Sequence, residues 1–375
     1  MRYASVRFHN YRQNRIFCSG SWDDKGAFYL PFEKIRTLFL QHNIELNTPD
    51  VNRGREISFE LHINVQRRAP THRAYVFQYE NAVVRPRNED LRALQAYHKV
   101  FTWNPVLAQL LGYKPNHWPH AVVLPYPNRL EVTAVPAFKD RPYGCVMVAS
   151  NKSLPVHDPR DLYPKRLEII RAFETESPSG FFSLYGRNWN YPPARPGKIG
   201  KLWASLRKRF PPPPRHPLAC WRGTIIDKDA LLKRAKFAVC YENVADIPGY
   251  ISEKIFDCLR CGCVPIYWGP KEITDYVPPQ CFIDARALPN PNSIVDHVLA
   301  LGENEHAQFQ EAMNGFLRSP QAAKFSMDYF ARSLVEEITG DLLQTECSSS
   351  VSSQSVQAWA EPTSRNTASR QMPAH

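Results

Sequence analysis

FAVCYENVADIPGYISEKIFDCLRCGCVPIYW, residues 237–268, contains two apolar runs that flank an amphipathic segment. The runs Phe237–Tyr241 and Val264–Trp268 have the length of buried β-strands, and Glu253–Arg260 carries apolar residues at helical spacing. Strands that are apolar throughout and joined through a helix are typical of parallel sheets with helices on both faces. The stretch therefore predicts one strand–helix–strand unit of an α/β domain.

Strands and helices alternate over the rest of the chain as well, in two groups separated by prolines. A chain of 375 residues with 43% hydrophobic and 22% charged residues can bury two cores and is too apolar to be disordered. We therefore expect an α/β protein of two Rossmann-like domains with parallel sheets. Strands are expected at Ile57–Ile63, Ala74–Tyr79, Cys145–Ala149 and Phe181–Tyr185, and helices at Phe32–Gln41, Asp90–Tyr97, Tyr163–Thr175 and Asp229–Ala235.

The border between the two groups is marked by prolines that interrupt regular structure. We place an N-terminal domain at residues 1–140 and a C-terminal domain at residues 141–345. Beyond Gln344 the composition changes to Ser, Thr, Gln, Ala and Pro, so we expect residues 346–375 to form a disordered tail. The interrupting prolines are Pro125, Pro127, Pro136 and Pro142.

The formal net charge of +11 predicts affinity for phosphate groups, which nucleic acids, anionic lipids and nucleotide sugars all carry. The basic residues are mostly scattered and no known nucleic-acid-binding module is present, which argues against nucleic acid as the partner. One denser patch is either a solvated loop or a docking surface for an anionic membrane or acceptor. It consists of Lys198, Lys201, Arg207, Lys208, Arg209 and Arg215.

The apolar segments and the cysteines indicate in which cellular compartment the protein is expected. The sequence has no run of about 18 apolar residues and no apolar signal after Met1. Cysteines such as Cys145 and Cys240 lie inside apolar segments, as reduced buried thiols do. We expect a soluble cytoplasmic protein, with peripheral contact to the inner membrane face through the insertion Tyr191–Pro217.

Polar residues follow the strands of the second half, at the edge where an open parallel sheet binds its ligands. Tyr250 then leads into Glu253 and Lys254 at the start of the next helix. We expect these cations, amides and carboxylates to face one crevice. The residues after the strands are Ser150, Asn151, Lys152, Arg187, Glu242 and Asn243.

Lys254 is the most informative of these residues. A cation in the first turn of a helix opposes the helix dipole by about 0.3–1 kcal/mol unless an anion lies there too. Helix N-termini bind phosphates, and Lys254 and Arg187 would neutralise a pyrophosphate leaving group. The other residues keep a structural alternative: Glu253 as a helix-start acid, Glu242 and Asn243 as a polar strand end, and Tyr250 as a packing aromatic.

Several rival motifs lack support in the sequence. There is no Gly-x-Gly-x-x-Gly after a strand and no Walker phosphate loop. Asp227 and Asp229 resemble a metal-binding pair but precede a helical run, where Asp is an ordinary N-cap. Cys258, Cys261 and Cys263 have no second Cys or His pair at zinc-site spacing. We expect no metal and no cofactor.

Three motifs of the second half closely resemble the donor-site signature of the α-1,3-fucosyltransferases, glycosyltransferase family 10. Further similarity lies in Val148–Asn151 and, in the first half, in Glu80-Asn81, Arg85-Pro86 and Phe101–Trp103. The resemblance implies a GT-B fold, a GDP-fucose donor bound mainly by the second domain, and inversion at the sugar carbon. The three motifs are Tyr241–Asn243, Ile247–Leu259 and Gly262–Gly269.

The resemblance also implies roles for individual residues. Arg187 and Lys254 would hold the diphosphate, and Asn243, Tyr250 and Glu253 would contact the donor's phosphates, sugar or ribose. Glu80, at the end of a first-domain strand, would face the donor and remove the acceptor proton, as single-displacement inversion requires. Without the resemblance, Glu80 would read as an exposed acid at a strand end.

The expected reaction transfers fucose from GDP-fucose to a hydroxyl of an oligosaccharide or glycolipid acceptor, in α-1,3 linkage and without a metal. A bacterial surface glycan precursor is the acceptor we expect. Three alternatives stay open. They are a different nucleotide-sugar donor, a nucleic-acid-binding protein, and a degenerate transferase kept as a binding scaffold.

Overall fold

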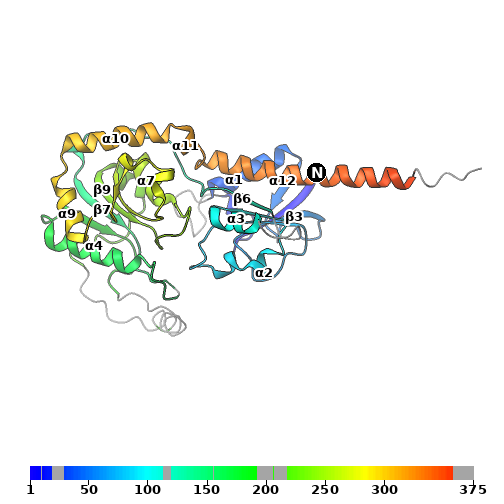
Figure 1. The fold of residues 1–375 in the computed structure, drawn as a ribbon, viewed down its shortest axis with the longest axis horizontal. Coiled ribbons are helices and arrows are strands. Elements are labelled where there is room, and N and C mark those ends of the chain that lie inside the picture. Colours follow the sequence, from blue (N-terminus) through cyan, green and yellow to red (C-terminus); the bar gives the residue numbers. More distant parts are fainter. Residues whose placement is uncertain are drawn as a thin grey trace, which may run out of the picture.

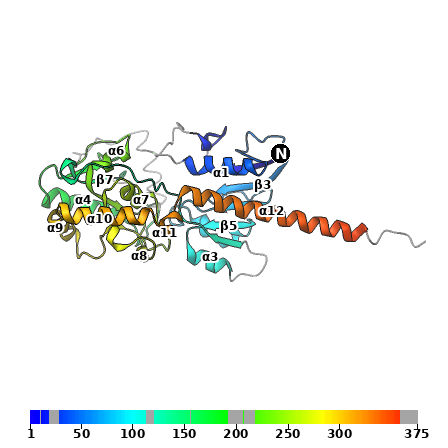
Figure 2. The same cartoon turned by 90° about the horizontal axis from the view of Figure 1, so that it is seen from above.

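The computed structural model describes residues 1–9, 11–18, 29–112, 120–154, 156–191, 206 and 218–357, with the backbone alone for 346–357. In these ranges the chain forms two parallel sheets, which lie in separate lobes in Figures 1 and 2. Helices pack on each sheet, which confirms the predicted α/β class. The basic residues of the predicted docking patch lie outside the described residues.

The first sheet has the order β2-β1-β3-β4-β5-β6, and its neighbouring strands are parallel. Its strands are β1 (Arg2–Arg7), β2 (Ile44–Asn47), β3 (Ile57–Ile63), β4 (Ala74–Phe77), β5 (Lys99–Thr102) and β6 (His120–Val123). The helices of this part are α1 (Leu30–Gln41), α2 (Leu91–Leu94) and α3 (Pro105–Gly112), with short 3-10 turns at Arg15–Phe17 and Pro86–Glu89.

The second sheet has the order β11-β10-β9-β7-β8 and is also parallel. Its strands are β7 (Tyr143–Val148), β8 (Phe182–Tyr185), β9 (Ala235–Tyr241), β10 (Val264–Trp268) and β11 (Ile283–Asp284). Its helices are α4 (Tyr163–Glu176), α6 (Lys228–Lys233), α7 (Glu253–Arg260), α8 (Ile273–Tyr276), α9 (Pro291–Ala300), α10 (Glu303–Leu317) and α11 (Pro320–Ala323), with 3-10 turns at Phe138–Asp140 and Pro279–Cys281.

Most predicted elements are present, and β3, α7 and β10 have the predicted bounds. β4 ends at Phe77 instead of Tyr79. The amides of Tyr79 and Glu80 donate to the side-chain oxygen of Asn64, at 2.9 and 2.8 Å, so the backbone turns out of the sheet there. The Asp227 carboxylate accepts from the Ala230 amide at 2.9 Å, which confirms the predicted N-cap of α6.

The last helix, α12 (Met327–Gln357), returns to the first domain. Its residues Phe330, Leu334 and Ile338 lie on one face and are buried in the first domain's core. The ring centroid of Phe330 lies 4.7 Å from that of Phe77 in β4. Lys99 of β5 also donates to Glu337 and Asp341, at 2.6 and 3.0 Å.

The position of α12 changes two boundaries predicted from the sequence. Residues 327–345, predicted to close the second domain, complete the first domain's core instead, because the apolar face of α12 is buried there. The helix then continues to Gln357 and projects beyond the first domain (Figures 1 and 2). The first part of the predicted tail is therefore helical, and residues 358–375 lie outside the described residues.

The two chain segments that cross between the domains pair with each other. The Asn128 amide donates to the Phe325 carbonyl at 2.7 Å, and the Met327 amide donates to the Asn128 carbonyl at 3.1 Å. The two crossing segments thus form a paired hinge segment between the domains.

Among the described residues, no helix has the length and apolar content needed to cross a membrane.

Candidate functional site

A cleft of about 1790 Å³ opens between the carboxyl ends of the two sheets, where parallel sheets bind ligands. The first domain lines it with Tyr79 and Glu80 after β4, and the second with Ser150, Asn243 and the first turn of α7. Basic side chains in the lining outnumber acidic ones. The basic residues are Arg12, Arg15, Arg53, Arg85, Arg129, Lys152, Arg166, Arg187, Lys228 and Lys254, and the acidic residues are Asp50, Glu80, Asp227, Asp229, Glu253 and Asp257.

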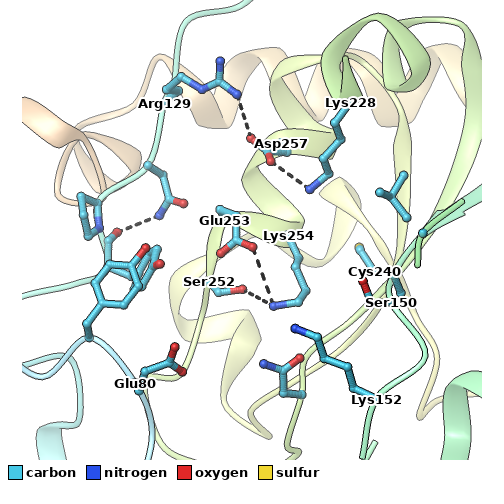
Figure 3. Close-up of a pocket in the computed structure, with 18 of the residues that line it drawn as sticks. Glu80, Arg129, Ser150, Lys152, Lys228, Cys240, Ser252, Glu253, Lys254 and Asp257 are labelled. Carbon is cyan, nitrogen blue, oxygen red and sulfur yellow. Dashed lines mark hydrogen bonds and ion pairs between the residues drawn. The ribbon is translucent and has the colours of Figure 1, made fainter. Parts of the chain in front are cut away.

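Lys254 is held at the start of α7 by a buried carboxylate. Its ammonium donates to the Ser252 hydroxyl at 2.8 Å (Figure 3) and to Glu242 at 2.9 Å. The Lys254 side chain is 21% exposed. Burial by itself would lower the pKa of Lys254, but Glu242 and Glu253 outweigh it and raise the pKa above its ordinary value. Lys254 is therefore a fixed, charged group at the wall of the cleft.

Glu242 does not line the cleft, unlike the donor contact predicted from the sequence. It is fully buried and accepts from the amide and hydroxyl of Ser252, from Lys254 and from the Tyr267 hydroxyl. The reason is that its side chain points under the N-terminus of α7. Glu242 also supplies an anion for Lys254, so the helix dipole alone does not call for a phosphate there.

Glu253 lies beside Lys254 in the first turn of α7 and lines the cleft, as predicted. Its side chain is 48% exposed, and a carboxylate oxygen lies 4.0 Å from the Lys254 ammonium. Burial opposes ionisation of Glu253, but the cations of Lys254 and Lys228 outweigh it and lower its pKa. Glu253 is thus an ionised acceptor of hydrogen bonds at the mouth of the cleft.

Tyr250 both lines the cleft and joins the domains. Its ring is buried against Trp103 of the first domain, with centroids 5.1 Å apart. Gly249 precedes it with φ of 72°, and a Cβ there would lie 2.1 Å from the Trp103 carbonyl oxygen. Only glycine permits this approach. The loop before α7 is therefore docked on the first domain. Tyr250 packs as an aromatic and also lines the cleft, and its contact with a donor stays a prediction.

Asn243 and Arg187 line the cleft from two other strand ends. Asn243 accepts from Arg166 at 3.1 Å, and Arg166 also donates to the Tyr241 carbonyl at 2.6 Å. Sequence reasoning missed Arg166, a buried arginine on α4. Arg187 follows β8 and is exposed. Four of the predicted cations and amides therefore line the cleft: Lys152, Arg187, Asn243 and Lys254.

Asn151 takes a structural position instead of the predicted donor contact. Its amide donates to the carbonyls of Asn188 and Tyr191, at 3.1 and 2.8 Å, and Asn151 is not part of the cleft wall. Its own backbone amide donates to the Arg187 carbonyl at 2.9 Å. Asn151 thus fixes the loop that carries Arg187. The neighbouring Lys152, which was also expected to face the crevice, lines the cleft (Figure 3).

Glu80 lies on the first-domain side of the cleft, facing Lys254 and Lys152 in Figure 3. Asn64 and Asn88 fix its backbone: Asn64 accepts from the Glu80 amide at 2.8 Å, and Asn88 donates to the Glu80 carbonyl at 2.6 Å. Burial raises the pKa of the Glu80 carboxyl, and the Lys254 ammonium opposes part of the rise. The carboxyl is free to meet a ligand in the cleft.

An ion-pair network in the cleft wall was not foreseen. Lys228 pairs with Asp257 at 2.9 Å, and Arg129 lies 3.6 Å from Asp257 (Figure 3). Arg129 also pairs with Asp229 at 3.0 Å. Asp257 stands one helical turn after Glu253, so helix periodicity could have found it. Nothing in the sequence pattern identified Arg129.

Sequence comparison supports the resemblance for the second domain. Residues 222–311 match the model of glycosyltransferase family 10 (fucosyltransferase), C-terminal part. The chain is 36% identical over 69 residues to an alpha-(1,4)-fucosyltransferase of Arabidopsis thaliana, and 30% identical over 81 residues to an alpha-(1,3)-fucosyltransferase of Helicobacter pylori. These matches cover 18% and 22% of this chain and 17% of each relative.

Structural comparison bears on the fold. An alpha-glucosyltransferase in complex with UDP-glucose and DNA containing an abasic site superimposes with a TM-score of 0.52 at 10% identity. The superposition covers 90% of this chain and 99% of that one. The chain therefore has a GT-B fold, and its second domain resembles the C-terminal domain of glycosyltransferase family 10, the fucosyltransferases, as its sequence motifs predicted.

Proposed function

We propose that the chain is a glycosyltransferase that moves fucose from GDP-fucose to a hydroxyl of an oligosaccharide or glycolipid acceptor, in α-1,3 linkage. The transfer inverts the sugar carbon and uses no metal ion. One observation carries the proposal: Glu80 lies across the cleft from the fixed ammonium of Lys254 (Figure 3). The choice of fucose rests on the relatives, which are fucosyltransferases.

The donor diphosphate would bind at the start of α7. An ammonium has three N–H donors, and Lys254 uses two of them on Glu242 and Ser252. The third is available to a phosphate oxygen, and the helix N-terminus adds its own partial positive charge. Lys152 and Arg187 line the same wall. Fixed cations of this kind can neutralise a leaving diphosphate, the task that a metal ion performs in other transferases.

The acceptor would bind on the side of Glu80. Its carboxylate takes the proton of the acceptor hydroxyl while the hydroxyl oxygen bonds to the sugar carbon. The bond from that carbon to the diphosphate breaks, and its electron pair leaves with GDP. A single displacement of this kind inverts the carbon. Because the pKa of Glu80 is raised, its carboxylate is a stronger base than an exposed glutamate.

The test is a donor screen with purified protein, a panel of acceptors and GDP- and UDP-linked sugars, in the presence and absence of EDTA. We expect GDP release and a fucosylated product of inverted configuration, unaffected by EDTA. Mass spectrometry and NMR of the product identify the sugar and the linkage. Turnover with a different nucleotide sugar alone would refute the donor, and no turnover with any donor would refute the enzymatic function.

A further inference from the structure

A second group of cations lines the cleft on the first-domain side. Arg12 and Arg15 follow β1, and Arg53 follows β2. All three are exposed, and none has a part in the transfer step described above. Like charges gathered at one end of a cleft repel one another unless an anion joins them.

The loop that carries Arg12 and Arg15 is fixed by buried asparagines. The Asn14 side chain donates to Asn47 at 2.8 Å and accepts from the Thr48 amide at 2.8 Å, and the Asn14 amide donates to the Thr48 hydroxyl at 3.0 Å. Asn47 in turn donates to Asn52 at 3.1 Å, and both are buried. Buried polar networks of this kind hold a backbone in one shape.

The same loop has a strained backbone. His9, Gln13 and Asn14 have φ of 39°, 53° and 56°, a region that residues other than glycine rarely adopt. The Gln13 amide is tied to the Asp50 carboxylate at 2.8 Å, which helps to hold this shape. Strain that the surrounding structure maintains is found most often at binding and catalytic sites.

The charge at this end of the cleft is positive. Among the described residues of these two loops that line the cleft, Asp50 is the acid, and it is already engaged by the Gln13 amide. Burial works against the charge of Asp50, but Thr48, Gln13 and Arg12 outweigh it and lower its pKa, so it remains ionised. The loops after β1 and β2 therefore bring one carboxylate and three guanidinium groups to the cleft wall, and guanidinium groups match carboxylates and phosphates through paired N–H donors.

We propose that Arg12, Arg15 and Arg53 form a subsite for an anionic group, a carboxylate or a phosphate, on the acceptor glycan. The inference rests on the proposed function, because that function makes the first-domain side of the cleft the acceptor side. It goes further in naming the acceptor class: a glycan with a negative charge near the fucosylated sugar.

Direct binding tests the subsite without relying on turnover. The probes are three oligosaccharides of equal length, ending in glucuronic acid, in a sugar phosphate or in a neutral sugar, titrated into the full chain with GDP present. We expect at least one anionic probe to bind 10-fold or more tightly than the neutral one, with an affinity that falls as salt rises. The preferred anion distinguishes carboxylate from phosphate.

The test variant combines Arg12→Gln, Arg15→Gln and Arg53→Gln, which should fold normally because all three side chains are exposed. It should lose the preference for the anionic probe and bind the neutral probe as before. Arg55→Gln is the matched control. Arg55 lies in the same turn as Arg53, but it stacks on Tyr3 at 4.3 Å and lies outside the cleft wall.

Equal binding of the three probes, or a preference that survives the triple variant, would overturn the subsite. The hydrolysis of GDP-fucose by water separates this failure from failure of the proposed function, since that reaction needs no acceptor. If hydrolysis occurs and the preference is absent, the transferase stands and the subsite falls. If no donor is consumed but the arginine-dependent preference is present, the anion-binding site stands and the transferase function falls.

Discussion

The two walls of the cleft present their cations in different ways. On the second-domain wall, Lys254 is anchored by the buried carboxylate of Glu242 and is 21% exposed. On the first-domain wall, Arg12, Arg15 and Arg53 are exposed, and it is the backbone beneath them that buried asparagines fix. An anchored ammonium suits one constant group, the diphosphate, whereas longer free side chains suit an acceptor whose anion varies in position.

The largest effect should come from Glu80, the proposed base on the first-domain wall. Glu80→Gln keeps the shape of the side chain but cannot take a proton, so kcat should fall about 10²–10⁴-fold. GDP binding should change little. Glu56→Gln, an exposed first-domain position outside the cleft wall, is the control. Steady-state kinetics measure kcat, and titration with GDP measures GDP binding. A loss of kcat below tenfold would assign the base to another group.

The second-domain wall, where Glu242 anchors Lys254, is tested by Lys254→Met. Loss of one fixed donor should lower kcat/KM for the donor about 10²–10³-fold. It also leaves the buried Glu242 without its cation, which should destabilise the fold by a few kcal/mol, on the order of 3. Adding Glu242→Gln should restore much of the stability in denaturant unfolding but not the activity. Recovery of activity in the double variant would contradict the role of Lys254.

The first-domain wall is tested by removing Asn14, which fixes the loop that carries Arg12 and Arg15. Asn14→Ala removes the hydrogen bonds to Asn47 and Thr48 and puts alanine at a positive φ, so unfolding free energy should fall by about 1–3 kcal/mol. KM for an anionic acceptor should rise several-fold while KM for the donor stays constant. Asn14→Gly removes the same bonds without the backbone strain and should recover about 1 kcal/mol. Equal stability of the two variants would show that strain is absent.

The smallest effect should be a shift in pH dependence. Glu80 works as a base only when ionised, and burial raises its pKa above the ordinary 4.5, so kcat/KM should fall as pH drops through a value above 4.5. The Lys254 cation lowers that pKa. In Lys254→Met, the fall of the residual kcat/KM at acid pH should therefore occur at a higher pH than in the wild type. A fall of kcat/KM that moves to lower pH in this variant would contradict the effect of Lys254 on the pKa of Glu80.

Local patterns accounted for most of the second domain. Its strands and α7 follow from short apolar runs and helical spacing, and the residues at their ends, such as Arg187 and Asn243, line the cleft as predicted. Glu80 and Lys254 share that cleft although they are far apart in sequence. The resemblance was needed to pair them, since no periodicity links the two halves.

Other features depend on side-chain direction and long-range packing, which patterns do not carry. Glu242 and Asn151 occupy strand ends like their neighbours but turn inward, onto α7 and onto the Arg187 loop. Arg12 and Arg15 lie in an irregular loop with no repeat to interpret. The helical spacing of Phe330, Leu334 and Ile338 is visible in the sequence, but the domain that receives them is not.

The return of α12 has a consequence for biosynthesis. A ribosome releases the first sheet early, yet Phe330, Leu334 and Ile338 emerge only after the whole second sheet. Until then Phe77 lacks its contact with Phe330, so the nascent first domain exposes apolar surface to chaperones while the second domain is being made. Stop codons placed before Met327 should for this reason yield aggregated protein even though both sheets are encoded in full.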